Sequence, residues 1–368
     1  MCTESKNHLL DLERRPRSAG LDLYRVVAAV VTFAFHSYCH LGANWGWFNY
    51  VARNGAAFMT AFFMLSGFSI FRSYANENLI KIENMKLFWI KRLIKILPLY
   101  YIVALLTILF GLISNTVMDE IKLAPAEILG IQSTFSSLFE FSHNGGSWFI
   151  SCILICYLVY PFLQEVLKQI SIKSSIVMLC LCVAILLYAP LVVRWFGLNS
   201  IYSNPFFRIL EFTIGAILAS LKNEWDTKPF VKKYVYNWIS VTLVGAVMAL
   251  GMTIAVRAGI GVGDYMLYNW ICLPCLSFIL LGMSGTKMGF LEKSKLLRYC
   301  STTSYAFYFS QFFFVDICRW IIGEYDITNC FFILVLSWTV CIILTLMLYE
   351  WAEKPITRFL RRKLIDWA

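Results

Sequence analysis

One apolar stretch near the start of the chain contains an arginine and a histidine, Arg25 and His36, within residues 21–40. In a helix, the eleven-residue spacing amounts to three turns plus roughly 20°, so both side chains share one face, about 16 Å apart along the axis. Neutral imidazole can accept the proton of a hydroxyl, and a guanidinium can bind an anion. The alternative is a snorkelling arginine and a histidine that only hydrogen-bonds to a neighbouring helix.

Two other pairs of charged residues occur at a spacing of three. Arg92 and Lys95 stand just before an apolar stretch, where they can either grip phosphate groups or lie among lipid headgroups. Arg208 and Glu211 stand inside such a stretch, where charges are costly and therefore suspected of function. For this second pair, the simpler interpretation is an ion pair that fixes the helix.

Histidine and cysteine spacings that could hold a metal ion lack further ligands. His40 follows His36 by one helical turn, but no acidic partner stands nearby, so we expect a polar residue at the membrane interface. Cys272 and Cys275 have the spacing of zinc ligands, but no second pair matches them, and most of the cysteines lie in apolar runs. We therefore expect no metal site.

The elements that must position these residues are membrane-spanning helices. Of 368 residues, 59% are hydrophobic and 15% charged, whereas soluble domains are about a quarter charged. A span needs roughly 20 mostly apolar residues. The sequence predicts an all-α polytopic membrane protein, with about ten transmembrane helices in one bundle, at residues 21–40, 54–74, 96–113, 147–167, 174–193, 205–221, 235–256, 265–283, 299–322 and 327–350. Residues 114–146 are expected to form a long loop.

The distribution of basic residues predicts the orientation. Lysines and arginines concentrate in both terminal segments and in every second loop, whereas the intervening loops contain only Arg53, Lys122, Arg194 and Arg257. Positive charge marks the cytoplasmic side, so both termini are expected there and residues 114–146 outside. The net charge of +10 is thus a topology signal, and no nucleic-acid partner is expected. The predicted parts are an N-terminal tail (1–20), a transmembrane domain (21–353) and a basic C-terminal tail (354–368).

Several short segments, in one order along nearly the whole chain, resemble a known family. Arg25 is followed by ten residues and then His36, and the later segments are FFMLSGFSIF from Phe62, KRLIKILPLYY from Lys91, SWFIS from Ser147, FRILEFTIGAILA from Phe207, Ser304-Tyr305 with Tyr308, and Glu353-Lys354-Pro355. Together they resemble the acyltransferase 3 family of integral-membrane O-acyltransferases. Departures are Lys95 in place of an arginine, Ile153 and Leu154 in place of two glutamates, and Gln311 where a histidine often stands.

The resemblance implies that His36 is the catalytic residue and that Arg25, Arg92 and Lys95 bind the phosphates of acyl-coenzyme A. A negative charge developing on the acyl oxygen would need hydrogen-bond donors, for which Ser147, Trp148, Ser66 or a backbone N–H are candidates. Direct transfer and a covalent acyl-histidine both remain open. Arg208 and Glu211 are further site candidates.

The expected function is transfer of an acyl group, by family habit acetyl, from cytoplasmic acyl-coenzyme A to a hydroxyl of a surface polysaccharide or a lipid-linked sugar. The expected location is a cell membrane, the bacterial cytoplasmic membrane, where lipids surround the bundle. The alternative is a non-enzymatic glycan flippase, polymerase or small-molecule transporter. Transporters often contain internal repeats, and no repeat is evident in this sequence.

Overall fold

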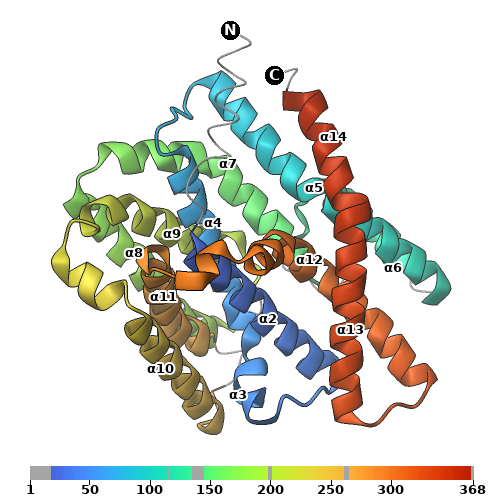
Figure 1. The fold of residues 1–368 in the computed structure, drawn as a ribbon. Coiled ribbons are helices and arrows are strands. Elements are labelled where there is room, and N and C mark those ends of the chain that lie inside the picture. The colour runs from blue at the N-terminus through green and yellow to red at the C-terminus, as the bar shows by residue number, and fades with distance from the viewer. Residues whose placement is uncertain (1–17, 115–116, 135–144, 198–200, 261–264, 366–368) are drawn as a thin grey trace.

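The computed structural model describes residues 18–114, 117–134, 145–197, 201–260 and 265–365, and among them it contains helices and no strands (Figure 1). The longer helices are α2 (Ala19–Leu41), α4 (Met59–Tyr74), α5 (Ile82–Ser114), α6 (Val117–Ile128), α7 (Trp148–Gln169), α8 (Ile172–Phe196), α9 (Pro205–Trp225), α10 (Trp238–Arg257), α11 (Leu273–Gly285), α12 (Lys295–Glu324), α13 (Cys330–Leu348) and α14 (Lys354–Ile365). Short elements are α3 (Asn49–Ala52), the 3₁₀ turns η1 (Gly46–Phe48), η2 (Gly55–Phe58), η3 (Gln132–Thr134) and η8 (Gly289–Lys293), and the π turns η5 (Val231–Val235), η7 (Leu267–Cys272) and η9 (Tyr349–Glu353).

The predicted polytopic helical bundle is confirmed. In the part of the chain that the structure describes, eight helices are long and apolar enough to cross a membrane. The two other predicted spans, 205–221 and 299–322, are also helical, as α9 and α12. These two helices contain more polar and charged residues, and each buries a polar stripe against its neighbours.

The structure differs from the predicted boundaries at three places. Residues 114–146, expected as a loop, contain the helix α6. The span predicted at 96–113 is part of α5, which begins at Ile82 and is 33 residues long. Residues 354–365 form the amphipathic helix α14, which continues from α13 through a π turn and lies beside α5 (Figure 1).

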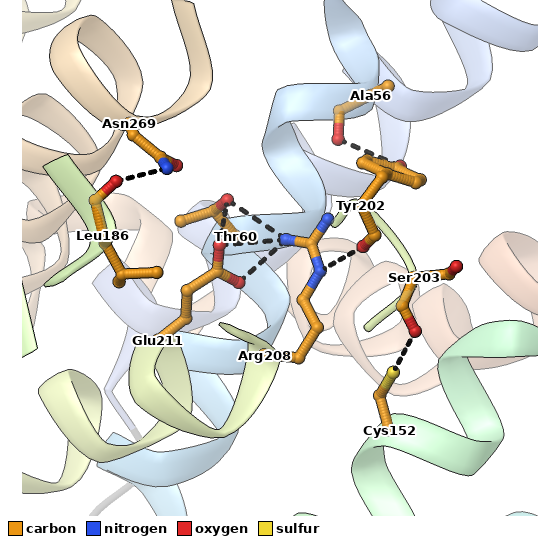
Figure 2. Close-up of polar contacts among 9 residues, drawn as sticks. All are labelled: Ala56, Thr60, Cys152, Leu186, Tyr202, Ser203, Arg208, Glu211 and Asn269. Atoms are coloured by element: carbon orange, nitrogen blue, oxygen red, sulfur yellow. Dashed lines mark hydrogen bonds and ion pairs between the residues drawn. The ribbon is translucent and has the colours of Figure 1, made fainter. Parts of the chain in front are cut away.

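Two prolines inside helices, Pro161 and Pro190, free carbonyls that bind neighbouring helical segments. A proline removes the N–H that would bond the carbonyl four residues earlier, and inside a membrane that carbonyl needs another donor. Pro161 in α7 frees the carbonyl of Tyr157, which accepts a hydrogen bond from the Trp89 indole of α5 at 3.0 Å. Pro190 in α8 frees the carbonyl of Leu186, and the Asn269 amide donates to it (Figure 2).

Helices α4 and α9 cross in close contact. A Cβ atom on Gly67 of α4 would lie 1.9 Å from the carbonyl oxygen of Phe212, and one on Gly215 of α9 would lie 1.9 Å from that of Met64. Small residues let membrane helices approach closely, which gains the packing energy that lipid cannot supply. The crossing therefore requires glycine at both positions.

Candidate functional site

A cavity of about 430 Å³ opens between α2, α4, α5, α7, α12 and the end of α13 with α14. Five positively charged side chains and one carboxylate line it: Arg25, Lys95, Glu353, Lys354, Arg358 and Arg361. We call the end of the bundle that carries these charges the basic end. Farther in, the lining consists of serine, threonine and aromatic side chains.

The excess of positive charge is the main physical property of this cavity. Lys354 contacts the carboxylate of Glu350, which also accepts a hydrogen bond from the Tyr299 hydroxyl at 3.1 Å. Arg358 and Arg361 follow Lys354 at one and two helical turns, so the same face of α14 presents all three. Like charges around one concave surface repel each other, and an anion bound between them would relieve that repulsion.

Helices α2 and α12 run side by side and hold the two sequence-predicted residues of the first span. Arg25 donates to the Ser301 hydroxyl at 3.1 Å, and Ser301 donates to Asp22 at 2.6 Å. Farther along, the ring of His36 lies 5.3 Å from the ring of Phe312. Arg25 and His36 are eleven residues apart on α2, as are their contacts Ser301 and Phe312 on α12. Arg25 and His36 therefore share the face of α2 that packs on α12, about 16 Å apart along the axis.

The cavity ends against a cluster of three aromatic rings. The ring of Tyr308 on α12 lies 5.2 Å from that of Phe62 on α4 and 5.3 Å from that of Phe149 on α7. Phe312, which contacts His36, is one helical turn beyond Tyr308, a rise of about 6 Å. The described cavity therefore stops about one turn short of the histidine.

His36 is surrounded by rings and lacks a partner for one ring nitrogen. Its ring lies 5.4 Å from Phe35, 5.8 Å from His40 and 5.3 Å from Phe312. Its Nδ1 atom is buried and has no hydrogen-bond partner within the described part of the chain. Buried polar atoms are satisfied in the great majority of cases, so an unsatisfied imidazole nitrogen indicates a position that a substrate or water can fill.

The structure brings Lys95 into the cavity but places Arg92 behind its wall. The guanidinium of Arg92 stacks among the rings of Tyr74, Phe88 and Tyr157, at 5.1, 5.5 and 5.9 Å from the ring centroids. Of these rings, only Tyr157 lines the cavity. Phosphate binding by Arg92 stays a prediction, and it would require the guanidinium to reach past Tyr157.

Arg208 and Glu211 form a buried ion pair in a separate, closed network (Figure 2). Arg208 donates to both carboxylate oxygens of Glu211 at 2.9 Å and through Nε to the carbonyl of Tyr202 at 2.7 Å. The Thr60 hydroxyl donates to the same carboxylate at 2.9 Å, which ties α9 to α4. Neither charged residue lines the cavity. This geometry favours the interpretation of Arg208 and Glu211 as an ion pair that fixes the position of α9 in the bundle.

The two candidates at the start of α7 have different surroundings. Trp148 is buried, and its ring lies 4.8 Å from Tyr202 and 5.1 Å from the Arg208 guanidinium, so it belongs to the ion-pair network. Ser147 is the residue before α7, and its buried hydroxyl has no hydrogen-bond partner in the described residues. Its neighbour Gly145 packs on Phe312, which places this turn at the depth of His36.

Several cavity residues were not predicted as site residues. Ser301, Tyr305 and the α14 side chains Arg358 and Arg361 line the cavity, although the sequence places both arginines in a predicted tail. One signal for the arginines was available. Lys354, Arg358 and Arg361 recur at the spacing of one helix face, next to the apolar side of the same segment.

The described residues form an all-helical bundle with apolar spans and a charged cavity, which is the architecture of a polytopic membrane protein. A family model described as an acyltransferase domain matches residues 18–348, nearly the whole chain, so the protein belongs to the acyltransferase 3 family. It is therefore a membrane acyltransferase. No curated protein and no solved structure matched the chain. Helix α14 lies beyond the matched residues.

Proposed function

We propose that this protein transfers an acyl group, with acetyl as the first candidate, from acyl-coenzyme A in the cytoplasm to a hydroxyl of a surface polysaccharide or lipid-linked sugar. One observation carries the proposal: a single cavity has a strongly basic mouth and a deep end one helical turn from a half-buried histidine whose Nδ1 atom is buried. An acyl donor that is anionic at one end and reactive at the other fits a cavity that is basic at its mouth and ends near a histidine.

The basic end suits the donor. Coenzyme A carries several phosphate groups at one end and a thioester at the other. Arginine binds phosphate oxygens through two parallel N–H donors, and lysine binds them as a point charge. Arg25, Lys95, Arg358 and Arg361 would hold the phosphates, and the aromatic part of the cavity would take the pantetheine arm. For the thioester to reach His36, the ring of Tyr308 or Phe62 must rotate aside.

The chemistry at His36 is proton transfer coupled to acyl transfer. The hydroxyl oxygen of the acceptor bonds to the thioester carbon while its proton passes to the imidazole. The bond between that carbon and sulfur then breaks, and the proton passes to the leaving thiolate, giving an ester and free coenzyme A. Neutral imidazole suits this task because its working form carries no charge to be desolvated. An acyl-histidine route has the same overall balance.

The proposed orientation places the basic end in the cytoplasm. Lys95, Lys354, Arg358 and Arg361 belong to segments that the distribution of basic residues assigns to that side. The donor is then cytoplasmic, and the acceptor approaches His36 from the outer half of the membrane.

The test is an assay with oriented vesicles. Purified protein is reconstituted into sealed liposomes, its orientation is determined by protease protection, and acetyl-coenzyme A with a labelled acetyl group is supplied outside or inside. We expect label in the glycan acceptor only when the donor is on the side of the basic end. Equal labelling from both sides, or labelling that does not need this protein, would contradict the proposal.

A further inference from the structure

Gln311 on α12 is a buried polar residue for which the described structure gives no partner. The exposed fraction of its side chain is 0%, and neither Oε1 nor Nε2 makes a hydrogen bond in the described part of the chain. An amide left in this state loses its hydration without compensation. Such groups are rare in native structures and mark positions where water or a ligand completes the network.

The position of Gln311 connects the cavity with the histidine. Ser301, Ser304, Tyr308 and Gln311 recur at spacings of three, four and three, so they form one stripe along α12. The first three line the cavity. Gln311 continues the stripe one turn beyond the cavity's end, and the next residue, Phe312, packs on His36. The amide therefore lies at the depth where the reaction is proposed to occur.

The two serines of the stripe already have acceptors within the protein. Ser301 donates to Asp22, and Ser304 donates to the carbonyl oxygen of Ser301 at 2.8 Å. Another buried glutamine, Gln164 on α7, donates to the carbonyl of Tyr74. A fully buried glutamine in this fold can thus be tied to the backbone, and Gln311 is not.

We infer that Gln311 binds the acyl carbonyl, its Nε2–H donating a hydrogen bond to the carbonyl oxygen of the thioester. As the acceptor oxygen bonds to the carbonyl carbon, the π electrons move to that oxygen, and the hydrogen bond strengthens as the charge develops. When the carbon–sulfur bond breaks, the carbonyl re-forms and the proton held by His36 passes to the thiolate. An amide has no titrating group, so it supplies a fixed donor and leaves proton transfer to the histidine. This inference rests on the proposed function.

The test compares two substitutions that remove a buried amide and keep the side chain's volume. Gln311→Met should lower kcat about 10²–10³-fold, the usual loss for an oxyanion donor, while the KM for acyl-coenzyme A changes little. Its Tm should stay the same or rise, because the substitution removes an unsatisfied polar group. Gln164→Met is the control. It should lower Tm, because the Tyr74 carbonyl loses the amide donor of Gln164 and keeps only the backbone N–H of Glu77, while the kcat of the folded fraction is retained.

Two results would overturn the inference. A Gln311→Met protein with a kcat near that of the wild type would show that the amide does not bind the reacting carbonyl. A fall in Tm as large as that of Gln164→Met, with lost activity restored under stabilising conditions, would assign Gln311 to packing. Failure of the proposed function looks different, because the wild-type protein itself would not transfer the acyl group from coenzyme A.

Discussion

Removing the charge of Glu211 should strongly destabilise the folded protein, because it leaves Arg208 charged in the interior. Both side chains are 4% exposed, and the carboxylate accepts two hydrogen bonds from Arg208 and one from Thr60. Glu211→Gln keeps the shape of the side chain but removes the negative charge. Arginine cannot release its proton in a protein, so the positive charge remains.

The expected loss can be estimated from these contacts. Breaking a buried ion pair by removing one partner typically costs about 3–5 kcal/mol. The rings of Trp148, Tyr202 and Phe63 around Arg208 stay in place in the variant. Their attraction to the guanidinium is therefore the same in both proteins and does not change the loss of stability. Native proteins are stable by about 5–15 kcal/mol, so this loss removes a large part of the total.

The double variant Arg208→Met with Glu211→Leu separates structure from chemistry. Apolar side chains of similar volume often replace a buried ion pair without loss of stability. We therefore expect the double variant to unfold near the wild-type denaturant concentration and to retain acyl transfer. The measurement is denaturant unfolding in detergent micelles, followed by tryptophan fluorescence. A Glu211→Gln protein as stable as the wild type would refute this reasoning, and a stable but inactive double variant would assign the pair a chemical role.

Three further predictions concern the cavity, the helix crossing and the topology. Arg358→Ala and Arg361→Ala should each raise the KM for acyl-coenzyme A about 10- to 150-fold, which corresponds to the loss of one charged contact of about 1.5–3 kcal/mol. The control is Arg362→Ala, whose KM should not change because Arg362 does not line the cavity. Equal KM values in all three variants would count against the α14 site. Gly215→Leu should abolish the monodisperse peak in size-exclusion chromatography, because the leucine side chain would meet the Met64 carbonyl. Gly245→Leu is the control and should be tolerated, because the space around Gly245 is open. A well-folded Gly215→Leu protein would contradict the close crossing. A single cysteine introduced at Thr134, an exposed residue of η3, in an otherwise cysteine-free protein, should react with an impermeant maleimide in intact cells. Labelling only after permeabilisation would reverse the proposed orientation.

The sequence was sufficient to predict the long apolar helices because lipid imposes a simple rule. Runs of about 20 apolar residues must be helical in a membrane, since no other local structure satisfies their backbone groups. The same regularity placed Arg25 and His36 on one face, because eleven residues are close to three whole turns. The i, i+3 spacing of Arg208 and Glu211 likewise indicated the ion pair that is observed.

Other features depend on contacts that a local pattern does not contain. Whether Arg92 or Lys95 faces the cavity depends on the rotation of α5 against α7, which is determined in part by the contact of Trp89 with the carbonyl freed at Pro161. A run of basic residues at 354–363 is equally typical of a tail and of a helix, and only its packing against α5 places it at the site. In the sequence, Gln311 was only a departure from a family pattern. Its missing partners are visible once the neighbouring helices are in place.

The central claim is that His36 accepts the proton of the acceptor hydroxyl, and the most direct measurement is acyl transfer by purified His36→Ala beside His40→Ala. Removing a general base costs about 10²–10⁴-fold in rate. We expect His36→Ala to fall by at least that lower factor while its Tm and monodispersity match the wild type, and His40→Ala to keep most of its activity. A well-folded His36→Ala protein that transfers the acyl group at near the wild-type rate would contradict the account.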